Sequence, residues 1–406
     1  MKIYIMDTIE LPNGSGGVTH KWELARNLSK MGHEVHVMAY EDTKVEGAVT
    51  HTMKTREKYG FEFFFKLIHL LSILRVIIVC NPDIIYTRNV SFALLGLLIK
   101  RIKNAKLVLE LNGISVLELN GLYSSSTISI QSSIHRKFEK KGFGMRIFKR
   151  IRMAITDYLE IFTAKKSGAV IAVTQRIKEI LIKRGVDENK ITVIPNGADV
   201  NLFRPISDVI AVNKLRNKYS INENTRVVMF VGSLAYWQGV EYLIQSAPLV
   251  LKAAPDTMFF IVGEGELKNE LITLAKKIGV SDKCIFTGNV PYEKVPLYIN
   301  MADVCIVPKK ILGFGYSPLK LYEYMACGKP VVATKTAGFE ILEKYNAGLL
   351  VNPENPEEFS NAIIKLLLNR KLGEQMGANG RELVVREYSW ESAAKKTIEV
   401  FRTLLE

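Results

Sequence analysis

A lysine and a glutamate three residues apart, Lys320 and Glu323, carry the clearest chemical signal in this sequence of 406 residues. They lie in the stretch SPLKLYEYMACGKPVV, which predicts a helix start with Ser317 as the N-cap and Pro318 at the first helical position. A helix over residues 318–327 places Lys320 in the first turn, where the helix dipole favours anions and disfavours cations. A lysine at this position therefore indicates that a negatively charged ligand binds beside it.

The chemistry that this pattern suits is the recognition of a nucleotide. Free backbone amides of Leu319 and Lys320, together with the lysine ammonium, suit a diphosphate. Glu323 lies one turn further along the same face, and its carboxylate suits the vicinal hydroxyls of a ribose. The alternative is an ordinary Lys–Glu pair on a surface helix, which contributes only about 0.2–0.5 kcal/mol.

Short apolar segments alternate with helical ones along the chain and must position these groups. A first set runs from KIYIMD to ITVIPNG, and a second set begins at RVVMFVGS and ends at AGLLV. This alternation is typical of the α/β class and predicts two Rossmann-like units, each a parallel sheet with helices on both faces. The join lies in PNGADVNLFRP, and sheets of this kind bind ligands beyond the carboxyl ends of their strands.

Glycine-rich turns follow several of the predicted strands and let a ligand approach bare backbone amides. None of them is a Walker motif or GxGxxG, which disfavours classical ATP and NAD binding. Each taken alone fits an ordinary strand-to-helix turn equally well, but together they predict one cleft. The turn residues concerned are Gly16, Gly17, Gly232, Ser233, Gly263 and Glu264.

The composition is that of a globular protein in a reducing compartment. Hydrophobic residues make up 48% and charged residues 24% of the chain, so two or three domains can each bury a core. The four cysteines are scattered, with no CxxC pair, which disfavours a zinc site or a disulfide framework. The stretch MKIYIMD reads directly as a strand, so we expect no signal peptide and a cytoplasmic location.

The most apolar run, residues 61–79, reads as a helix packed on a sheet. Its polar residues recur every three or four positions and form one stripe. Two of them, Lys66 and Arg75, are basic, which disfavours a membrane span. A helix that dips into a membrane surface is the alternative.

Much of the net charge of +14 lies in residues 136–152, where Glu139 is the single acid. Ile147, Ile151 and Ile155 recur every four residues and predict a basic amphipathic helix. It suits an anionic membrane surface or a charged lipid-linked substrate, with a plain solvated face as the alternative. No aromatic-basic recognition motif accompanies it, which disfavours nucleic acid. The residues expected to contact membrane or acceptor are Arg146, Lys149, Arg150 and Arg152.

In this order, the motifs resemble those of the retaining glycosyltransferases of the GT-B fold, specifically the large group 1 family (glycosyltransferase family 4), in a branch with an SPLKLYEYM donor motif. The resemblance covers essentially the whole chain, from GSGGVTHKWELARNLSKMGHEVHV through FVGSLAYWQGVEYLI to YSWESAAKKTIEVF. It implies an acceptor-binding domain over residues 1–196 plus 388–406, with the last helix crossing back. It also implies a donor-binding domain over residues 197–387, which faces the first across a cleft and holds a nucleotide-diphosphate sugar.

Residue by residue, the resemblance implies contacts with the donor. Glu323 matches the final glutamate of the family's spaced glutamate pair, which implies the ribose contact. Gly232 and Ser233 match the turn under the diphosphate. Gly16 and Gly17 match the amino-terminal loop that closes on the diphosphate, and Asn289 and Val290 match the segment that meets the base.

Three departures from the family pattern affect the site. The first glutamate of the pair falls at Gly315, and a histidine common at the end of an amino-domain strand appears as Asn112. The usual Arg and Lys after the glycine turn are replaced by Ser233 and Gln238. Because two cations are missing, we infer that Lys320 supplies the counter-charge of the diphosphate. The expected catalytic residues are Lys320, Glu323 and Asn112, and the donor site is completed by Gln238, Gly263, Glu264, Gly315, Ser317, Pro318 and Leu319.

The family implies front-face attack, in which the departing phosphate oxygen takes the acceptor proton and no protein base is required. No DxD-like run is present and the family fold is usually metal-independent, so we expect no metal or other cofactor. Glu110 and Glu118, near Asn112, are the acids to test as acceptor or sugar contacts.

We therefore expect a hexosyltransferase that moves a sugar from a nucleotide-diphosphate sugar to a glycan or lipid-linked acceptor, peripherally bound at the inner face of the cell membrane. One alternative is a nucleotide-sugar 2-epimerase, which uses the same two-domain fold and needs paired acids and a histidine in the cleft. The other is a non-catalytic nucleotide-sugar-binding subunit, which the missing glutamate and histidine motivate.

Overall fold

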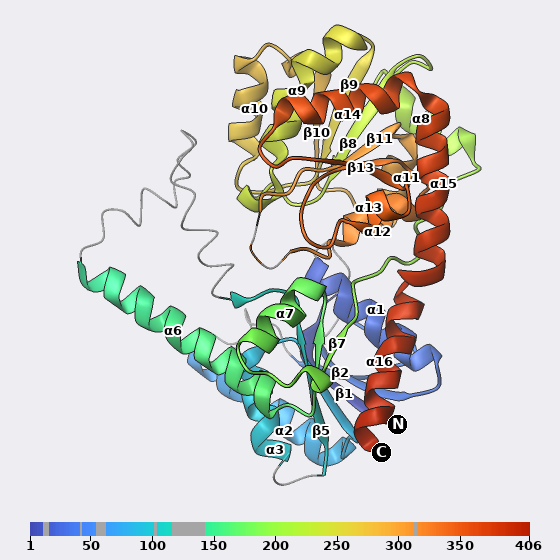
Figure 1. The fold of residues 1–406 in the computed structure, drawn as a ribbon. Helices are drawn as coiled ribbons and strands as arrows, with labels where there is room; N and C mark the ends of the chain where they lie inside the picture. Colours follow the sequence, from blue (N-terminus) through green and yellow to red (C-terminus); the bar gives the residue numbers. More distant parts are fainter. Residues whose placement is uncertain are drawn as a thin grey trace. The chain divides into compact units, whose positions relative to one another are not determined.

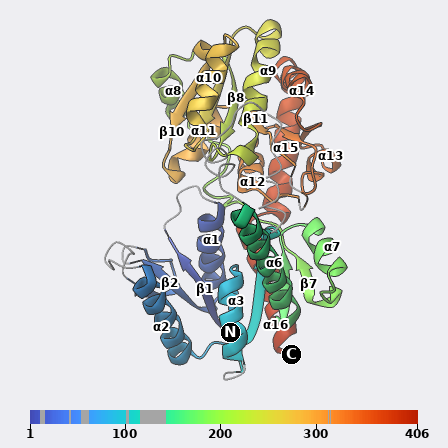
Figure 2. The same cartoon turned by 90° about the vertical axis from the view of Figure 1, so that its left-hand side faces the viewer.

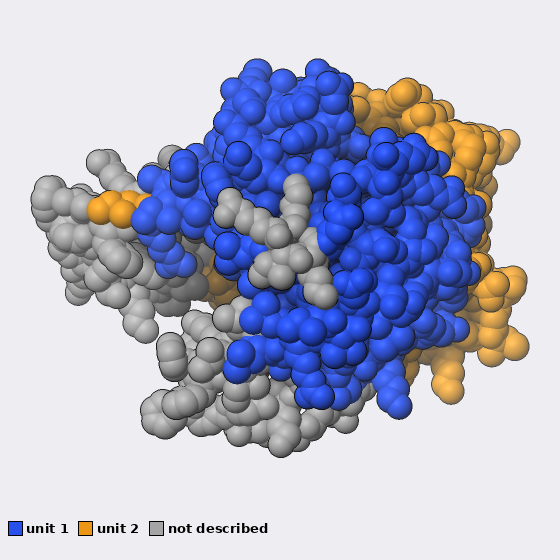
Figure 3. Space-filling model, turned by 90° about the horizontal axis from the view of Figure 1, so that it is seen from below, with its two compact units in different colours: residues 1–116, 152–196, 390–406 blue, residues 117–151, 197–389 orange. Residues whose placement is uncertain are grey.

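The computed structural model describes residues 1–10, 16–40, 43–53, 62–100, 104–115, 143–311, 313 and 315–406. The chain forms two compact units, coloured separately in Figure 3. Unit 1 contains Met1–Val116, Arg152–Asn196 and Trp390–Glu406, and unit 2 contains Leu117–Ile151 and Gly197–Ser389.

Unit 1 is built on a seven-stranded parallel sheet in the order β3-β2-β1-β4-β5-β6-β7. The central strands are buried on both faces, as a parallel sheet between two helix layers requires. The strands are β1 (Lys2–Ile9), β2 (Glu34–Tyr40), β3 (Val49–Met53), β4 (Ile84–Thr87), β5 (Lys106–Leu111), β6 (Ala169–Ala172) and β7 (Ile191–Val193).

The helices of unit 1 cover both faces of this sheet. They are α1 (Gly16–Lys30), α2 (Glu62–Cys80), α3 (Val90–Lys100), α6 (Phe143–Lys166), α7 (Gln175–Lys183) and α16 (Trp390–Leu405). Figure 1 shows α1 and α16 on one side of the strands and α2, α3 and α6 on the other. The last helix, α16, packs against α1 and β5, so the surface that it covers belongs to unit 1.

Unit 2 repeats the design with a six-stranded parallel sheet in the order β10-β9-β8-β11-β12-β13. Together the two sheets confirm the predicted α/β class. The strands are β8 (Arg226–Val231), β9 (Thr257–Val262), β10 (Cys284–Gly288), β11 (Val304–Val307), β12 (Val331–Thr334) and β13 (Gly348–Val351).

Two hydrophobic cores hold the helices of unit 2 onto its sheet. On one face, Tyr298, Tyr324 and Val384 belong to a core shared by α8, α11, α12 and α15. On the other, Leu243 and Phe359 belong to a core shared by α9, α10 and α14, and α14 packs against α9 (Figure 1, Figure 2). The helices are α8 (Val209–Lys218), α9 (Val240–Ala253), α10 (Lys268–Lys277), α11 (Val295–Met301), α12 (Leu319–Ala326), α13 (Ile341–Lys344), α14 (Pro356–Leu368) and α15 (Arg370–Glu387).

The expected domain limits differ in two respects from the two units. The chain passes from unit 1 to unit 2 after Asn196, the residue that the expected limits give. It returns to unit 1 after Ser389, whereas the expected limits place this return after residue 387. Residues 117–151, which include the first turns of α6, are grouped with unit 2, and residues 117–142 among them lie outside the described part of the chain. Among the helices that the structure describes, none combines the length and apolar character needed to cross a membrane.

Candidate nucleotide-sugar site

The helix that carries Lys320 and Glu323 begins one residue later than expected, at Leu319. Ser317 is not its cap, so this expectation was wrong: Pro318 takes the cap position in an extended conformation, and the Ser317 hydroxyl is 3.0 Å from the Tyr322 hydroxyl. Gly328 adopts a positive φ of 69° just beyond the helix, as expected of its terminating glycine.

The alternative of a surface Lys–Glu pair is wrong, because all eight residues of α12 are buried. Among the described residues Lys320 and Glu323 form no ion pair with each other: Lys320 donates to Gln238, and Glu323 accepts from Tyr292. The amide of Leu321 donates to the Pro318 carbonyl oxygen, whereas within the described chain the amides of Leu319 and Lys320 have no acceptor. Two free amides at a helix start attract an anion.

Lys320 lies on a polar platform made by residues far away in the sequence. Its Nζ donates to Gln238 Oε1 at 3.0 Å, and Gln238 Nε2 donates to Ser233 Oγ at 3.1 Å. The ammonium also sits 3.8 Å from the centre of the Phe230 ring. A Cβ on Gly232 would lie 2.4 Å from Lys320 Nζ, so a larger residue there would displace the ammonium from this position. Unit 2 thus brings together four of the predicted donor residues: Gly232, Ser233, Gln238 and Lys320.

Burial dominates the electrostatics of this group. Burial, reinforced by the nearby charge of Lys309, lowers the pKa of Lys320 well below its usual range, and Glu323 only partly opposes the shift. Burial likewise raises the pKa of Glu323 to about 7. The hydrogen bond from the Tyr292 hydroxyl (3.0 Å) and the charge of Lys320 both lower this pKa, but they do not outweigh burial. Burial therefore disfavours the charged form of both side chains.

Close backbone packing explains the glycines at the ends of β8, β9 and β10. Gly232 donates to the Val262 carbonyl oxygen (2.9 Å), and Gly263 donates to the Gly288 carbonyl oxygen (3.0 Å). A Cβ on Gly263, which has a φ of 134°, would lie 2.0 Å from the Gly232 carbonyl oxygen. The role of Gly263 in the structure is thus to bring the strand ends together beside Lys320.

The missing first glutamate also has a backbone reason. Gly315 has a φ of 75°, and a Cβ there would lie 2.7 Å from the Ala337 carbonyl oxygen. A glutamate at Gly315 would therefore meet both backbone strain and a clash.

Three further donor predictions lie at the same edge of the sheet. The Glu264 carboxylate pairs with Lys268, four residues further along the chain. Asn289 is exposed directly after β10, and Val290 is half-buried against the hydrophobic core. The structure places these residues without assigning a ligand to them.

In unit 1, Gly16 and Gly17 open α1, and a Cβ on Gly17 would meet open space. The Gly17 carbonyl oxygen accepts from Arg88 Nη1 at 3.2 Å. Asn112 follows β5, and its Oδ1 is buried without a hydrogen-bond partner among the described residues. Such an orphaned acceptor is rare in a folded protein.

Glu110, which the sequence offered as an acceptor or sugar contact, is buried and already occupied. Its carboxylate pairs with His20 Nε2 (3.1 Å) and Arg88 Nε (3.0 Å) and accepts a short hydrogen bond from Tyr86. Burial raises the pKa of Glu110, but His20 and Arg88 outweigh it and lower that pKa to about 2. Glu110 is therefore a structural anion of unit 1, and Glu118 lies outside the described residues.

The contacts around Glu110 could not be predicted from the sequence. Through His20 they reach Asn196 and Trp390, the residues at which the chain leaves unit 1 and returns to it. His20 Nδ1 lies 2.7 Å from Asn196 Oδ1, and its ring meets that of Trp390 edge-on, with the centres 4.9 Å apart.

Lys309 is a second residue of interest that the sequence did not single out. It is buried directly after Pro308, at the carboxyl end of β11. Its sequence signal is two lysines next to the end of an apolar strand.

The predicted amphipathic helix corresponds to α6, which exposes a long apolar stripe. Ile151, Ile155, Tyr158 and Phe162 are 53%, 53%, 66% and 37% exposed. They recur at helical spacing, and the rings of Tyr158 and Phe162 stack. Arg152 is exposed as well, whereas the side chains of Arg146, Lys149 and Arg150 lie outside the described part.

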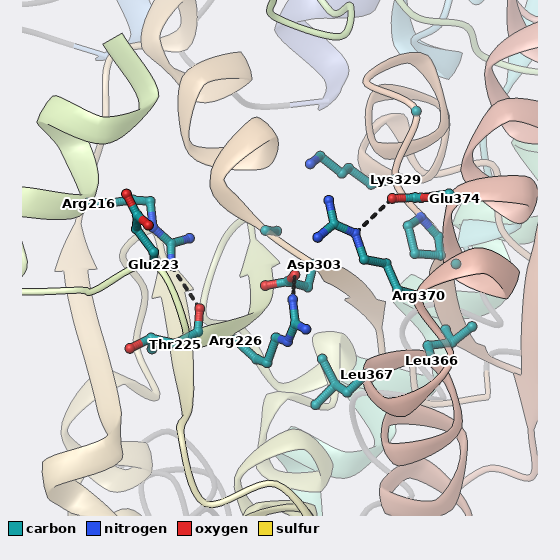
Figure 4. Close-up of a pocket in the computed structure, with 14 residues that line it drawn as sticks. Arg216, Glu223, Thr225, Arg226, Asp303, Lys329, Leu366, Leu367, Arg370 and Glu374 are labelled. Carbon is teal, nitrogen blue, oxygen red and sulfur yellow. Dashed lines mark hydrogen bonds and ion pairs between the residues drawn. The ribbon is translucent and has the colours of Figure 1, made fainter. Parts of the chain in front are cut away.

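A pocket of about 290 Å³ in unit 2 lies at the opposite, amino-terminal edge of the sheet, where β8, β11 and β12 begin. Figure 4 shows Arg226 paired with Asp303 and Arg370 paired with Glu374. Lys329 donates to the Asn300 carbonyl oxygen, so the lysine of this pocket is partnered too. The pocket lies apart from the Lys320 group.

Comparisons with known proteins identify relatives of the two halves of the chain. The family model "Glycosyltransferase Family 4" matches residues 14–202, and "Glycosyl transferases group 1" matches residues 211–383. An uncharacterized glycosyltransferase of Methanocaldococcus jannaschii is 26% identical over 100% of this chain and 99% of its own length.

Two further relatives are informative. A GDP-mannose-dependent alpha-(1-6)-phosphatidylinositol monomannoside mannosyltransferase of Mycobacterium tuberculosis is 30% identical over 52% of this chain and 55% of its own length. The structure of Anabaena HepE in complex with UDP and glucose superposes with a TM-score of 0.74 at 18% identity, covering 99% of this chain and 100% of that one. The chain is therefore a glycosyltransferase of the GT-B fold, whose amino-terminal part matches the family 4 model and whose carboxyl-terminal part matches the group 1 model.

Proposed function

We propose that unit 2 binds a nucleotide-diphosphate sugar at the carboxyl edge of its sheet, with the diphosphate on Lys320 and the ribose on Glu323. The observation that carries this proposal is the buried Lys320 ammonium, which has no carboxylate partner and lies beside two free amides within the described chain. A diphosphate would supply the missing negative charge.

The reaction proposed is sugar transfer with retention of anomeric configuration. Breaking the anomeric C–O bond leaves negative charge on the diphosphate, and Lys320 with the amides of Leu319 and Lys320 would stabilise it more than the ground state. The departing phosphate oxygen then takes the proton of the acceptor hydroxyl, so no protein base is needed. We propose that the reaction requires no metal ion.

We further propose a glycan or lipid-linked acceptor, bound by unit 1 at the cytoplasmic face of the membrane. The relative from M. tuberculosis is named for a lipid acceptor, phosphatidylinositol monomannoside. In this chain, α6 combines an exposed apolar stripe with a basic sequence, which suits an anionic membrane surface.

The donor proposal is tested by a thermal-shift panel of UDP-, GDP- and ADP-sugars. A donor at 100 times its dissociation constant is expected to stabilise the protein by about 2.7 kcal/mol. No stabilisation by any of the three, at concentrations up to several millimolar, would contradict the proposal. Transfer of labelled sugar to a lipid extract, without epimerised donor, then separates transfer from epimerisation.

The membrane proposal predicts a loss of vesicle binding when the basic face of α6 is removed. Replacing Lys149, Arg150 and Arg152 together by serine is expected to weaken binding to vesicles with anionic lipids about a hundredfold, because each basic residue contributes about 1 kcal/mol at such a surface. Co-sedimentation with vesicles measures the effect.

A matched control removes the same charge from unit 2. Lys252, Lys276 and Lys277 are exposed on α9 and α10, and their replacement by serine is expected to leave vesicle binding unchanged. Donor affinity should be unaffected in both triple variants. Equal vesicle binding by the α6 variant and the wild type would reject the membrane proposal.

A further inference from the structure

Three buried lysines lie near the proposed diphosphate position, and one of them has an evident structural role. Lys309, Lys310 and Lys320 are 5%, 5% and 8% exposed. Lys310 Nζ lies 2.6 Å from Glu241 Oε1 and 3.6 Å from the centre of the Tyr236 ring. Its charge is thus balanced inside the protein by a buried carboxylate.

Lys309 has no such balance. Among the described residues it forms no ion pair, and the contact that its ammonium makes is with the Tyr316 ring, whose centre lies 4.8 Å away. Burial lowers the pKa of Lys309 to about 7. An ammonium in this position is costly unless an anion arrives from outside.

The position of Lys309 connects it to the Lys320 group. It follows Pro308 at the carboxyl end of β11, and β11 pairs with β8, whose last residue, Val231, is followed by Gly232. The charge of Lys309 is also a cause of the lowered pKa of Lys320, second to burial. Two like charges buried close to each other oppose folding, so a purely structural role does not explain the pair.

We infer that Lys309 is a second phosphate-binding cation, and that Lys309 and Lys320 together hold the diphosphate of the donor. The inference rests on the proposed function and adds a residue that the family's motif pattern did not single out. The two lysines would thereby supply the positive charge that the family's usual Arg and Lys supply at the positions where this chain has Ser233 and Gln238.

The test compares dissociation constants of the wild type and Lys309→Met by isothermal titration calorimetry. UDP, GDP and ADP are titrated first, followed by the matching nucleoside of the one that binds and by inorganic pyrophosphate. Lys309→Met is expected to weaken binding of the diphosphate and of pyrophosphate about tenfold or more, and to change nucleoside binding less than about twofold. It should unfold at the same or a higher temperature, because it removes an unpaired buried ammonium.

Lys310→Met is the matched control, since it removes the neighbouring buried lysine. It leaves Glu241 without its cation, so it should lower thermal stability and leave the ratio of diphosphate to nucleoside affinity unchanged. A Lys309→Met protein that keeps its diphosphate affinity, or loses nucleoside affinity equally, overturns the inference.

The outcomes separate the inference from the proposed function. If no nucleoside diphosphate binds the wild type, the proposed function fails and the inference fails with it. If a diphosphate binds the wild type, and Lys309→Met keeps the preference for it while Lys320→Met loses that preference, Lys309 has no phosphate role and the proposed function stands.

Discussion

Replacing Lys320 by alanine is expected to lower kcat about 10²–10³-fold, the usual effect of removing one preorganised donor at a developing negative charge. The reason is that Lys320 lies at the free amides of α12, where the leaving diphosphate is proposed to develop its charge. Steady-state kinetics with the donor identified by thermal shift measures the effect. Binding of the nucleoside diphosphate should fall much more than binding of the nucleoside.

Lys320→Met serves as the control for a structural role. Methionine is close to lysine in volume, and it removes a buried ammonium that no carboxylate within the described chain balances. The unliganded Lys320→Met protein is therefore expected to be as stable as the wild type or more stable, although it has lost activity. Equal losses of affinity for nucleoside and nucleoside diphosphate would remove Lys320 from the phosphate site.

Replacing Glu110 by glutamine is expected to destabilise the protein by about 3–5 kcal/mol, because it leaves the buried side chains of His20 and Arg88 without their anion. Chemical denaturation measures the change. Glu179→Gln, which breaks an exposed pair with Arg176, should cost less than about 1 kcal/mol. A Glu110→Gln protein as stable as the Glu179→Gln control would contradict the structural role.

The same network predicts how stability depends on acid. The folded protein lowers the pKa of Glu110 to about 2 from the ordinary value of 4.5. The contribution of Glu110 is therefore fully present above pH 4.5 and is lost as the pH falls from 4.5 toward 2. Stability measured across this range should fall less steeply in Glu110→Gln than in the wild type.

The sequence predicted the architecture well because α/β alternation is a local signal. The two sheets, the helix around Lys320 and the need of the last helix for a surface all follow from apolar periodicity and turn residues. The start of α12 was misplaced by one residue, because Ser317 bonds to the Tyr322 hydroxyl instead of capping the helix. A difference of one or two residues at a helix end is common.

The site was predicted in part, and the part missed is held by long-range contacts. Gln238 reads in the sequence as a lost cation, whereas in the fold it holds Lys320, 82 residues away in the chain. In the sequence Glu110 looks like a free acid, but in the fold β4, β5 and α1 bring Tyr86, Arg88 and His20 to its carboxylate. Neither arrangement leaves a periodic signal.

A crystal structure of the wild-type protein with the nucleoside diphosphate that binds it tests the central claim most directly. The account predicts phosphate oxygens within hydrogen-bonding distance, about 2.7–3.2 Å, of Lys320 Nζ and the amides of Leu319 and Lys320. The ribose hydroxyls should lie on the Glu323 carboxylate. A diphosphate bound away from residues 319 and 320, with Lys320 still held by Gln238 alone, would contradict the account.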